Sequence, residues 1–121
     1  MEFEINDSKW IIRVVDEATI NNEMKRTDLM GITKFMTNEV WLLKNQGNII
    51  KTLKHELTHV WLYEYGHCQD DEFHYNAEDI CEIVASSNNF VNKITDRFIK
   101  CMSPKGKHES KQVSCSENSQ E

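Results

Sequence analysis

Two histidines and a glutamate in the middle of the chain have the spacing of a metal site that activates water. His55 and His59 are four residues apart, and Glu56 directly follows the first of them. On a helix, residues four apart lie one above the other, so two imidazole nitrogens can reach one Zn²⁺ ion at about 2.0–2.1 Å. Glu56 would lie about 60° around the helix from His59, beside the metal. There its carboxylate can take a proton from a zinc-bound water and pass it to a leaving amine.

A catalytic zinc site needs a third protein ligand and an open fourth position. Glu78 follows His59 by 19 residues and begins a predicted helix, where packing would hold it in place. Its neighbour Glu82, one turn further on, could accept the free N–H of a ligating histidine. His74 follows His59 by 15 residues, in a polar stretch, and is the alternative third ligand. We therefore predict a zinc site of His55, His59 and Glu78, with His74 left open.

The motif lies in a segment with the pattern of an amphipathic helix, from about residue 48 to residue 66. Asn48 offers an N-cap and Gly66 a stop. The two histidines fall at about 0° and 40° around this helix. The apolar side chains fall opposite them, at about 120–240°; they are Ile49, Ile50, Leu53, Leu57, Val60 and Trp61. The helix therefore turns its apolar face to a sheet and presents both imidazoles on the other side.

A second helix is predicted from about Ala77 to about Cys101. Its apolar side chains cluster on one face; they are Ile80, Ile83, Val84, Val91, Ile94 and Phe98. Glu78 and Glu82 lie on the other side with small residues next to them, which would let another helix approach closely. Residues 86–89, Ser-Ser-Asn-Asn, are weak helix formers and could kink or split this element.

Strand signals dominate the first 47 residues. Residues 9–15 are rich in β-branched side chains and predict a strand. Residues 16–31 look like a connection with room for a short helix. Residues 32–36 and 40–43 are separated by Thr-Asn-Glu and predict an antiparallel hairpin. We therefore expect an α+β fold, with a small antiparallel sheet packed on the motif helix and on the second helix.

Length and composition indicate one folded domain and a polar tail. The chain has 121 residues, of which 39% are hydrophobic and 28% charged, as is ordinary for a soluble globular protein. We assign residues 1–102 to the domain. Residues 103–121 carry one aliphatic side chain, Val113, and are expected to be disordered. The four cysteines are widely spaced with no C-x-x-C, which favours free thiols in a reducing compartment.

The net charge and the absence of apolar runs disfavour several classes of partner. A net charge of −6 disfavours binding to a nucleic-acid backbone. No stretch approaches the roughly 18 apolar residues of a membrane helix, and the first residues lack the basic start and apolar run of a secretory signal. We expect a cytoplasmic protein that acts on a protein or peptide substrate, without nucleic acid or membrane partners. The oligomeric state stays unknown.

The motif and the second helix together resemble a known group. Residues 55–59, His-Glu-Leu-Thr-His, followed by residues 78–85, Glu-Asp-Ile-Cys-Glu-Ile-Val-Ala, look like the ImmA/IrrE-type zinc metallopeptidases, in their small single-domain phage or mobile-element form. Those proteins show H-E-L-x-H and then a helix of the form E-x-x-A/C-N/D-x-F-A. The resemblance covers roughly residues 30–90, puts Glu78 at the metal-ligand position, and implies a zincin-like fold.

The chain differs from the ImmA/IrrE-type pattern at some positions, and it also resembles a second family. Glu82 stands where that group has Asn or Asp, and Ile83-Val84 replaces the usual aromatic. A weaker similarity is to SprT-like metalloproteases, in which a third histidine follows the motif at about the spacing of His74. The H-G-x-x-F context of those proteases is absent, because the chain reads His-Tyr-Asn-Ala-Glu at residues 74–78.

Two functions of different class follow from these observations. The first is a zinc endopeptidase (a hydrolase) acting on an intracellular protein such as a regulator, with a substrate strand added to the edge of the strand at residues 40–43. The second is a non-catalytic zinc-binding regulatory protein. Glu56 favours the first, because a purely structural zinc site has no use for a base beside it.

Overall fold

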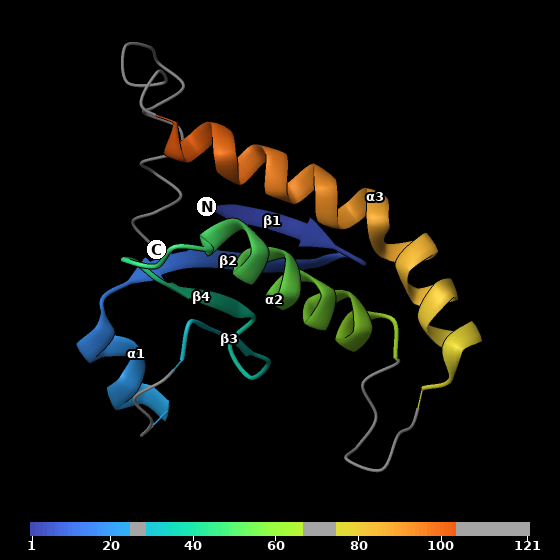
Figure 1. Cartoon of the computed structure of the whole chain (residues 1–121), viewed down its shortest axis with the longest axis horizontal. Helices are drawn as coiled ribbons and strands as arrows, with labels where there is room; N and C mark the ends of the chain where they lie inside the picture. Colours follow the sequence, from blue (N-terminus) through green and yellow to red (C-terminus); the bar gives the residue numbers. More distant parts are fainter. Residues whose placement is uncertain (25–28, 67–74, 104–121) are drawn as a thin grey trace.

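A four-stranded mixed sheet forms from the strand-rich first half of the chain (Figure 1). The computed structural model describes residues 1–24, 29–66 and 75–103. The strands are β1 (Glu2–Ile5), β2 (Ser8–Val15), β3 (Gly31–Lys34) and β4 (Glu39–Leu43). Their order in the sheet is β1-β2-β4-β3, so β1 and β3 are the two edges.

The strand pairing confirms one expectation and corrects another. β3 and β4 form the predicted antiparallel hairpin, with Thr33 opposite Val40. β1 pairs antiparallel with β2, but β2 and β4 run parallel, with Ile12 opposite Val40. The sheet is therefore mixed, and the expectation of an antiparallel sheet is wrong. The reason is the connection through α1 (Glu17–Met24), after which β3 takes the outer edge and leaves β4 beside β2.

The motif helix is α2 (Ile49–Glu64), and it covers one face of the sheet together with α3. Asn48 is its N-cap residue, although its side chain makes no capping hydrogen bond. After α2 ends, Gly66 adopts a φ of 80°, a left-handed conformation that suits glycine. Leu53, Leu57 and Val60 are fully buried, so the predicted apolar face of α2 is confirmed.

The second predicted helix is α3 (Ala77–Met102), and it begins with a capping box. The Asn76 side chain accepts a hydrogen bond from the Asp79 N–H, and the Asp79 carboxylate accepts one from the Asn76 N–H. These two bonds satisfy backbone donors that a helix start otherwise leaves unpaired. Residues 86–89 do not split α3, which is a single continuous helix.

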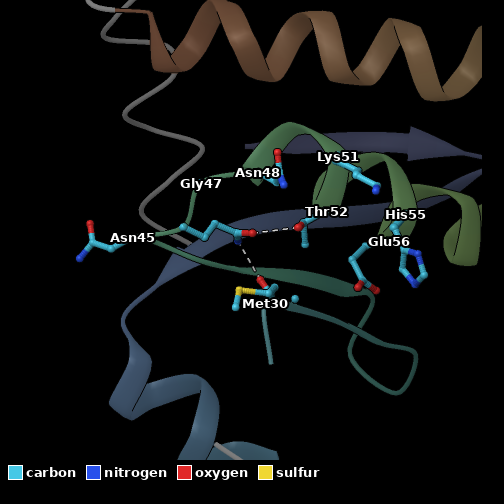
Figure 2. Close-up of a pocket in the computed structure, with 10 residues that line it drawn as sticks. Met30, Asn45, Gly47, Asn48, Lys51, Thr52, His55 and Glu56 are labelled. Atoms are coloured by element: carbon cyan, nitrogen blue, oxygen red, sulfur yellow. Dashed lines mark hydrogen bonds between the residues drawn. The ribbon is translucent and has the colours of Figure 1, made fainter. Parts of the chain in front are cut away.

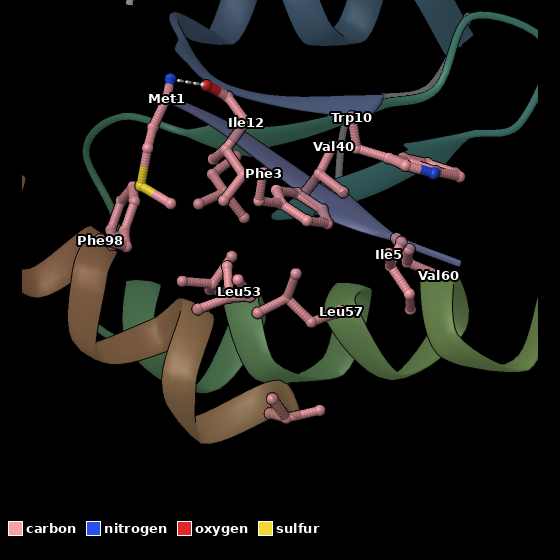
Figure 3. Close-up of a cluster of buried hydrophobic side chains, with 13 residues drawn as sticks. Met1, Phe3, Ile5, Trp10, Ile12, Val40, Leu53, Leu57, Val60 and Phe98 are labelled. Atoms are coloured by element: carbon pink, nitrogen blue, oxygen red, sulfur yellow. Dashed lines mark hydrogen bonds between the residues drawn. The ribbon is translucent and has the colours of Figure 1, made fainter. Parts of the chain in front are cut away.

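The core lies between the sheet and these two helices (Figure 3). Its fully buried side chains come from β2, β4 and α2 and include Trp10, Val40, Leu42, Leu53, Leu57 and Val60. From α3 the core takes Val91, Ile94 and Phe98. All three belong to the second half of α3, so this helix contributes to the core along only part of its length. The site-bearing helix α2 is packed along its whole length.

The prediction that the apolar face of α3 is buried is wrong for the first turns of this helix. Ile80 and Val84 are 52% and 57% exposed, although the sequence placed both on the buried face. Figure 1 shows that the yellow start of α3 extends past the end of the sheet, so the sheet does not cover these turns. None of the residues from Ala77 to Ser86 is buried.

Glu64, in the last turn of α2, joins this helix to the β1–β2 hairpin. Its Oε2 accepts a hydrogen bond of 2.8 Å from the Trp10 Nε1–H, and its Oε1 accepts one of 3.2 Å from the Ser8 hydroxyl. The Asn6 side-chain amide donates to the Glu64 backbone carbonyl at 3.0 Å. Trp10 is fully buried, so its N–H depends on this carboxylate.

We expect Glu64→Ala to lower the free energy of unfolding by about 1–3 kcal/mol, because it leaves the buried Trp10 N–H without an acceptor. Urea unfolding followed by tryptophan fluorescence measures this change. Glu17→Ala, at an exposed position in α1, is the matched control and should shift the free energy by less than about 0.5 kcal/mol. Equal unfolding midpoints for Glu64→Ala and the wild type would show that the contact contributes nothing.

Three further predictions, on membrane helices, cysteines and the tail, can be compared with the structure. None of the helices in the described parts of the chain is long and apolar enough to span a membrane. Cys81 is a free, exposed thiol. Cys101 is disulfide-bonded, so the expectation of free thiols is wrong there; spacing along a chain does not fix which cysteines meet in space. The predicted tail, apart from Ser103, lies outside the described residues.

Candidate metal centre and catalytic site

The two motif histidines meet on the exposed side of α2. Their Nε2 atoms are 3.2 Å apart, and their rings cross at 72°. Two ligands of one tetrahedral zinc ion, each at about 2.0–2.1 Å, are separated by about 3.3 Å. The two imidazoles therefore have the separation that a shared zinc ion requires. The same separation also suits an N–H···N hydrogen bond between neutral rings.

His59 favours the protonation state that binds metals. Burial lowers the pKa of His59 below its ordinary value, the negative charge of Glu56 opposes this shift, and His55 adds to it. His59 thus remains neutral further into the acidic range than a fully solvated histidine. Only the neutral imidazole has a free lone pair for a metal ion.

Glu56 is buried beside this pair, with 7% of its surface exposed. Acidic side chains are seldom buried without a partner, and the partner here comes from the sheet. The Thr33 hydroxyl, on β3, donates a hydrogen bond of 2.6 Å to Glu56 Oε1. The same hydroxyl lies 3.3 Å from the Glu56 backbone oxygen. The carboxylate is therefore held at the junction of α2 and the edge strand.

Gly31 allows β3 to approach α2 at this point. A Cβ added to Gly31 would lie 2.7 Å from Thr52 Cγ2 and 3.3 Å from Glu56 Cγ. The first distance is shorter than carbon atoms tolerate, so with any larger residue at position 31 either the Thr52 side chain or the strand would have to move. Sequence reasoning did not single out Gly31 or Thr33. Their signal is the hairpin register, because each faces a buried residue of β4 and so lies on the helix side of the sheet.

A hollow of about 640 Å³ opens beside Glu56 (Figure 2). Its walls are the start of β3, the turn at residues 45–48 and the first turns of α2; His55 and Glu56 lie at one end. Gln46 braces this turn, because its amide donates to the Met30 and Leu43 carbonyls while its carbonyl accepts from the Thr52 hydroxyl. Lys51 also lines the hollow.

Of the downstream ligand candidates, Glu78 and Glu82 lie in the described part of the chain, and neither is gathered at this pair. Glu78 is exposed in the first turn of α3. Glu82 is also exposed, and its Oε2 accepts a hydrogen bond of 3.3 Å from the Ser86 hydroxyl. In the parts of the chain that the structure describes, no three His, Cys, Asp or Glu side chains lie close enough together to hold a metal ion. His74 lies outside the described residues.

No protein-family model, curated protein or solved structure matches this chain. The chemistry of the site therefore has to be argued from its own residues. The described residues combine two imidazoles at zinc-ligand separation, a buried carboxylate held by a hydroxyl, and a hollow lined by His55 and Glu56.

Proposed function

We propose that this protein is a zinc-dependent metallopeptidase that cleaves a peptide bond in an intracellular protein, such as a regulator. The observation that carries the proposal is the His55–His59 pair, 3.2 Å apart at Nε2, with the buried Glu56 carboxylate next to it. Paired imidazoles and an adjacent base are what zinc-assisted hydrolysis requires. The resemblance of residues 55–59 and 78–85 to the ImmA/IrrE-type group supports the same proposal.

Each residue has a distinct role in this proposal. His55 and His59 would hold the zinc ion, with Glu78 as the proposed third ligand. A zinc ion bound there would supply a Lewis acid for a water molecule and for the carbonyl of the scissile bond. Glu56 accepts one proton from the attacking water as the C–O bond forms, and it returns that proton to the leaving nitrogen as the C–N bond breaks.

The edge strand β3 offers the place for a substrate. The expectation that a substrate strand would pair with residues 40–43 is wrong, because β4 is an inner strand, flanked by β2 and β3. β3 is the edge, and a Thr33 bond ties it to Glu56. An extended peptide that pairs with an exposed edge gains main-chain hydrogen bonds. A peptide added to β3 would pass beside the Glu56 carboxylate.

Metal analysis tests the first half of the proposal. We expect protein purified without chelators to carry one zinc ion per chain, measured by plasma mass spectrometry. The double variant His55→Ala/His59→Ala should lose the ion, and Lys54→Ala, on the same helix, should keep it. A wild-type protein that contains no zinc, and takes none up at micromolar concentrations, would falsify the proposal.

A search for new protein N-termini tests the second half. Wild-type protein and Glu56→Gln are expressed separately in the same cells, and N-terminal peptides of the two proteomes are compared. We expect new N-termini with the wild type alone. Bound zinc without any new N-terminus would instead favour the non-catalytic regulatory protein.

A further inference from the structure

The two carboxylate oxygens of Glu56 have different contacts, and either could act as the base. Oε1 accepts the 2.6 Å hydrogen bond from the Thr33 hydroxyl. We propose that Thr33 is a positioning residue, which fixes the Glu56 side chain so that Oε2 is the oxygen that accepts the proton. This inference rests on the proposed function, and it assigns a role to a strand residue outside the motif.

The geometry makes Oε1 the preferred acceptor of the Thr33 proton. The hydroxyl has one proton and two oxygens in range, Glu56 Oε1 at 2.6 Å and the Glu56 backbone oxygen at 3.3 Å. Hydroxyl bonds to a carboxylate are the shorter and stronger kind, at about 2.5–2.7 Å. The proton therefore goes to Oε1, and that oxygen is occupied.

Among the described residues, no donor binds the second oxygen of the Glu56 carboxylate, Oε2. Oε2 is also not a fully buried atom without a hydrogen-bond partner; the described part of the chain has one such atom, Thr95 Oγ1. Glu56 also lines the hollow (Figure 2). A carboxylate with one oxygen bound and the other open has a defined direction for proton transfer.

The sheet fixes the position of the Thr33 hydroxyl. Thr33 pairs with Val40, which is fully buried, and a β-branched side chain has few rotamers. Gly31, two residues earlier, keeps the strand close to α2. The distance between Thr33 and Glu56 is therefore set by strand pairing rather than by a flexible loop, as precise positioning of a catalytic group requires.

Thr33→Val tests the positioning role, because valine keeps the shape and removes the donor. We expect the kcat of the zinc-loaded protein to fall by about ten- to a hundredfold with KM within about twofold, since orientation and not substrate affinity is lost. The probe is a fluorogenic peptide that spans a cleavage site found by N-terminal mapping. Thr33→Ser should restore most of kcat, because serine supplies the same hydroxyl.

Thr95→Val is the matched control. Thr95 is buried in α3, and its hydroxyl has no hydrogen-bond partner, so this change removes a buried hydroxyl outside the site. Its kcat should equal that of the wild type. A second readout does not depend on activity: in crystal structures, Glu56 should keep one conformer in the wild type and in Thr33→Ser, and should leave that conformer in Thr33→Val.

The outcomes separate the two proposals. An unchanged kcat, or a change confined to KM, overturns the role of Thr33 and leaves the peptidase proposal intact. If the wild type cleaves nothing, the peptidase proposal fails, and the crystal structures decide whether Thr33 positions Glu56. A Glu56 carboxylate that stays in place in Thr33→Val overturns the positioning role in either case.

Discussion

Glu56→Gln is expected to lower peptide hydrolysis by about a hundredfold or more, the usual scale for removing a general base. Glutamine matches glutamate in size but cannot accept the proton. It retains a carbonyl oxygen for the 2.6 Å hydrogen bond from Thr33, so the packing of this buried side chain is preserved. Zinc content and melting temperature should therefore stay close to those of the wild type. Turnover of the fluorogenic peptide, metal analysis and thermal unfolding measure the three quantities.

Glu17→Gln is the control for this prediction, because it makes the same chemical change at an exposed position of α1. It should leave turnover unchanged. Activity retained by Glu56→Gln would mean that another group takes the proton. Loss of zinc or of stability in Glu56→Gln would mean that the carboxylate holds the structure together, and the case for a base would be lost.

The helices could be predicted from sequence because their evidence is local. Apolar side chains at helical spacing set the face of α2, and burial of Leu53, Leu57 and Val60 follows from that face. The same pattern places His55 and His59 together on the other side. The relative placement of His55, Glu56 and His59 is therefore set within a run of five residues, with a spacing that any helix would reproduce.

The sheet could not be predicted in full because strand neighbours are not local. Residue types indicate strands at residues 9–15 and 40–43, but not that these two lie side by side and run parallel. The same limit hid Thr33, which is 23 residues from Glu56 in the sequence and meets it only through the position of the edge strand. β1 was missed for another reason, because its four residues give only the shortest pattern by which a strand can be recognised.

The start of α3 shows a third limit of the sequence pattern. Ile80 and Val84 share the helix face of Val91 and Ile94, yet only the latter two are buried. A periodic pattern tells which face a helix would bury; it does not tell how far along the helix a packing partner extends. The exposed apolar residues and the exposed Glu78 lie in the same turns, which bears on the third zinc ligand.

If Glu78 is the third ligand, the first turns of α3 must lie against α2 when zinc is bound, because no third ligand lies at the histidine pair among the described residues. None of the residues from Ala77 to Ser86 is buried, so bringing Glu78 to the histidine pair would break little packing. The same movement would cover apolar surface of Ile80 and Val84, and metal binding commonly supplies free energy for such ordering. On this account the exposed position of Glu78 is compatible with its proposed ligand role.

Glu78→Ala is then expected to weaken zinc binding by about a hundredfold or more, because loss of a mere hydrogen-bonding neighbour of a ligand already costs about 10–100-fold. Competition with a chromophoric chelator measures the affinity. His74→Ala should leave zinc bound, and Glu82→Ala should weaken binding by about tenfold if Glu82 accepts a bond from a ligating histidine. Zinc should also reduce binding of a hydrophobic dye to the wild type but not to Glu78→Ala, because only the former covers Ile80 and Val84. If His74→Ala loses the metal and Glu78→Ala retains it, the third ligand is His74, and the similarity to SprT-like proteases is the better guide to this site.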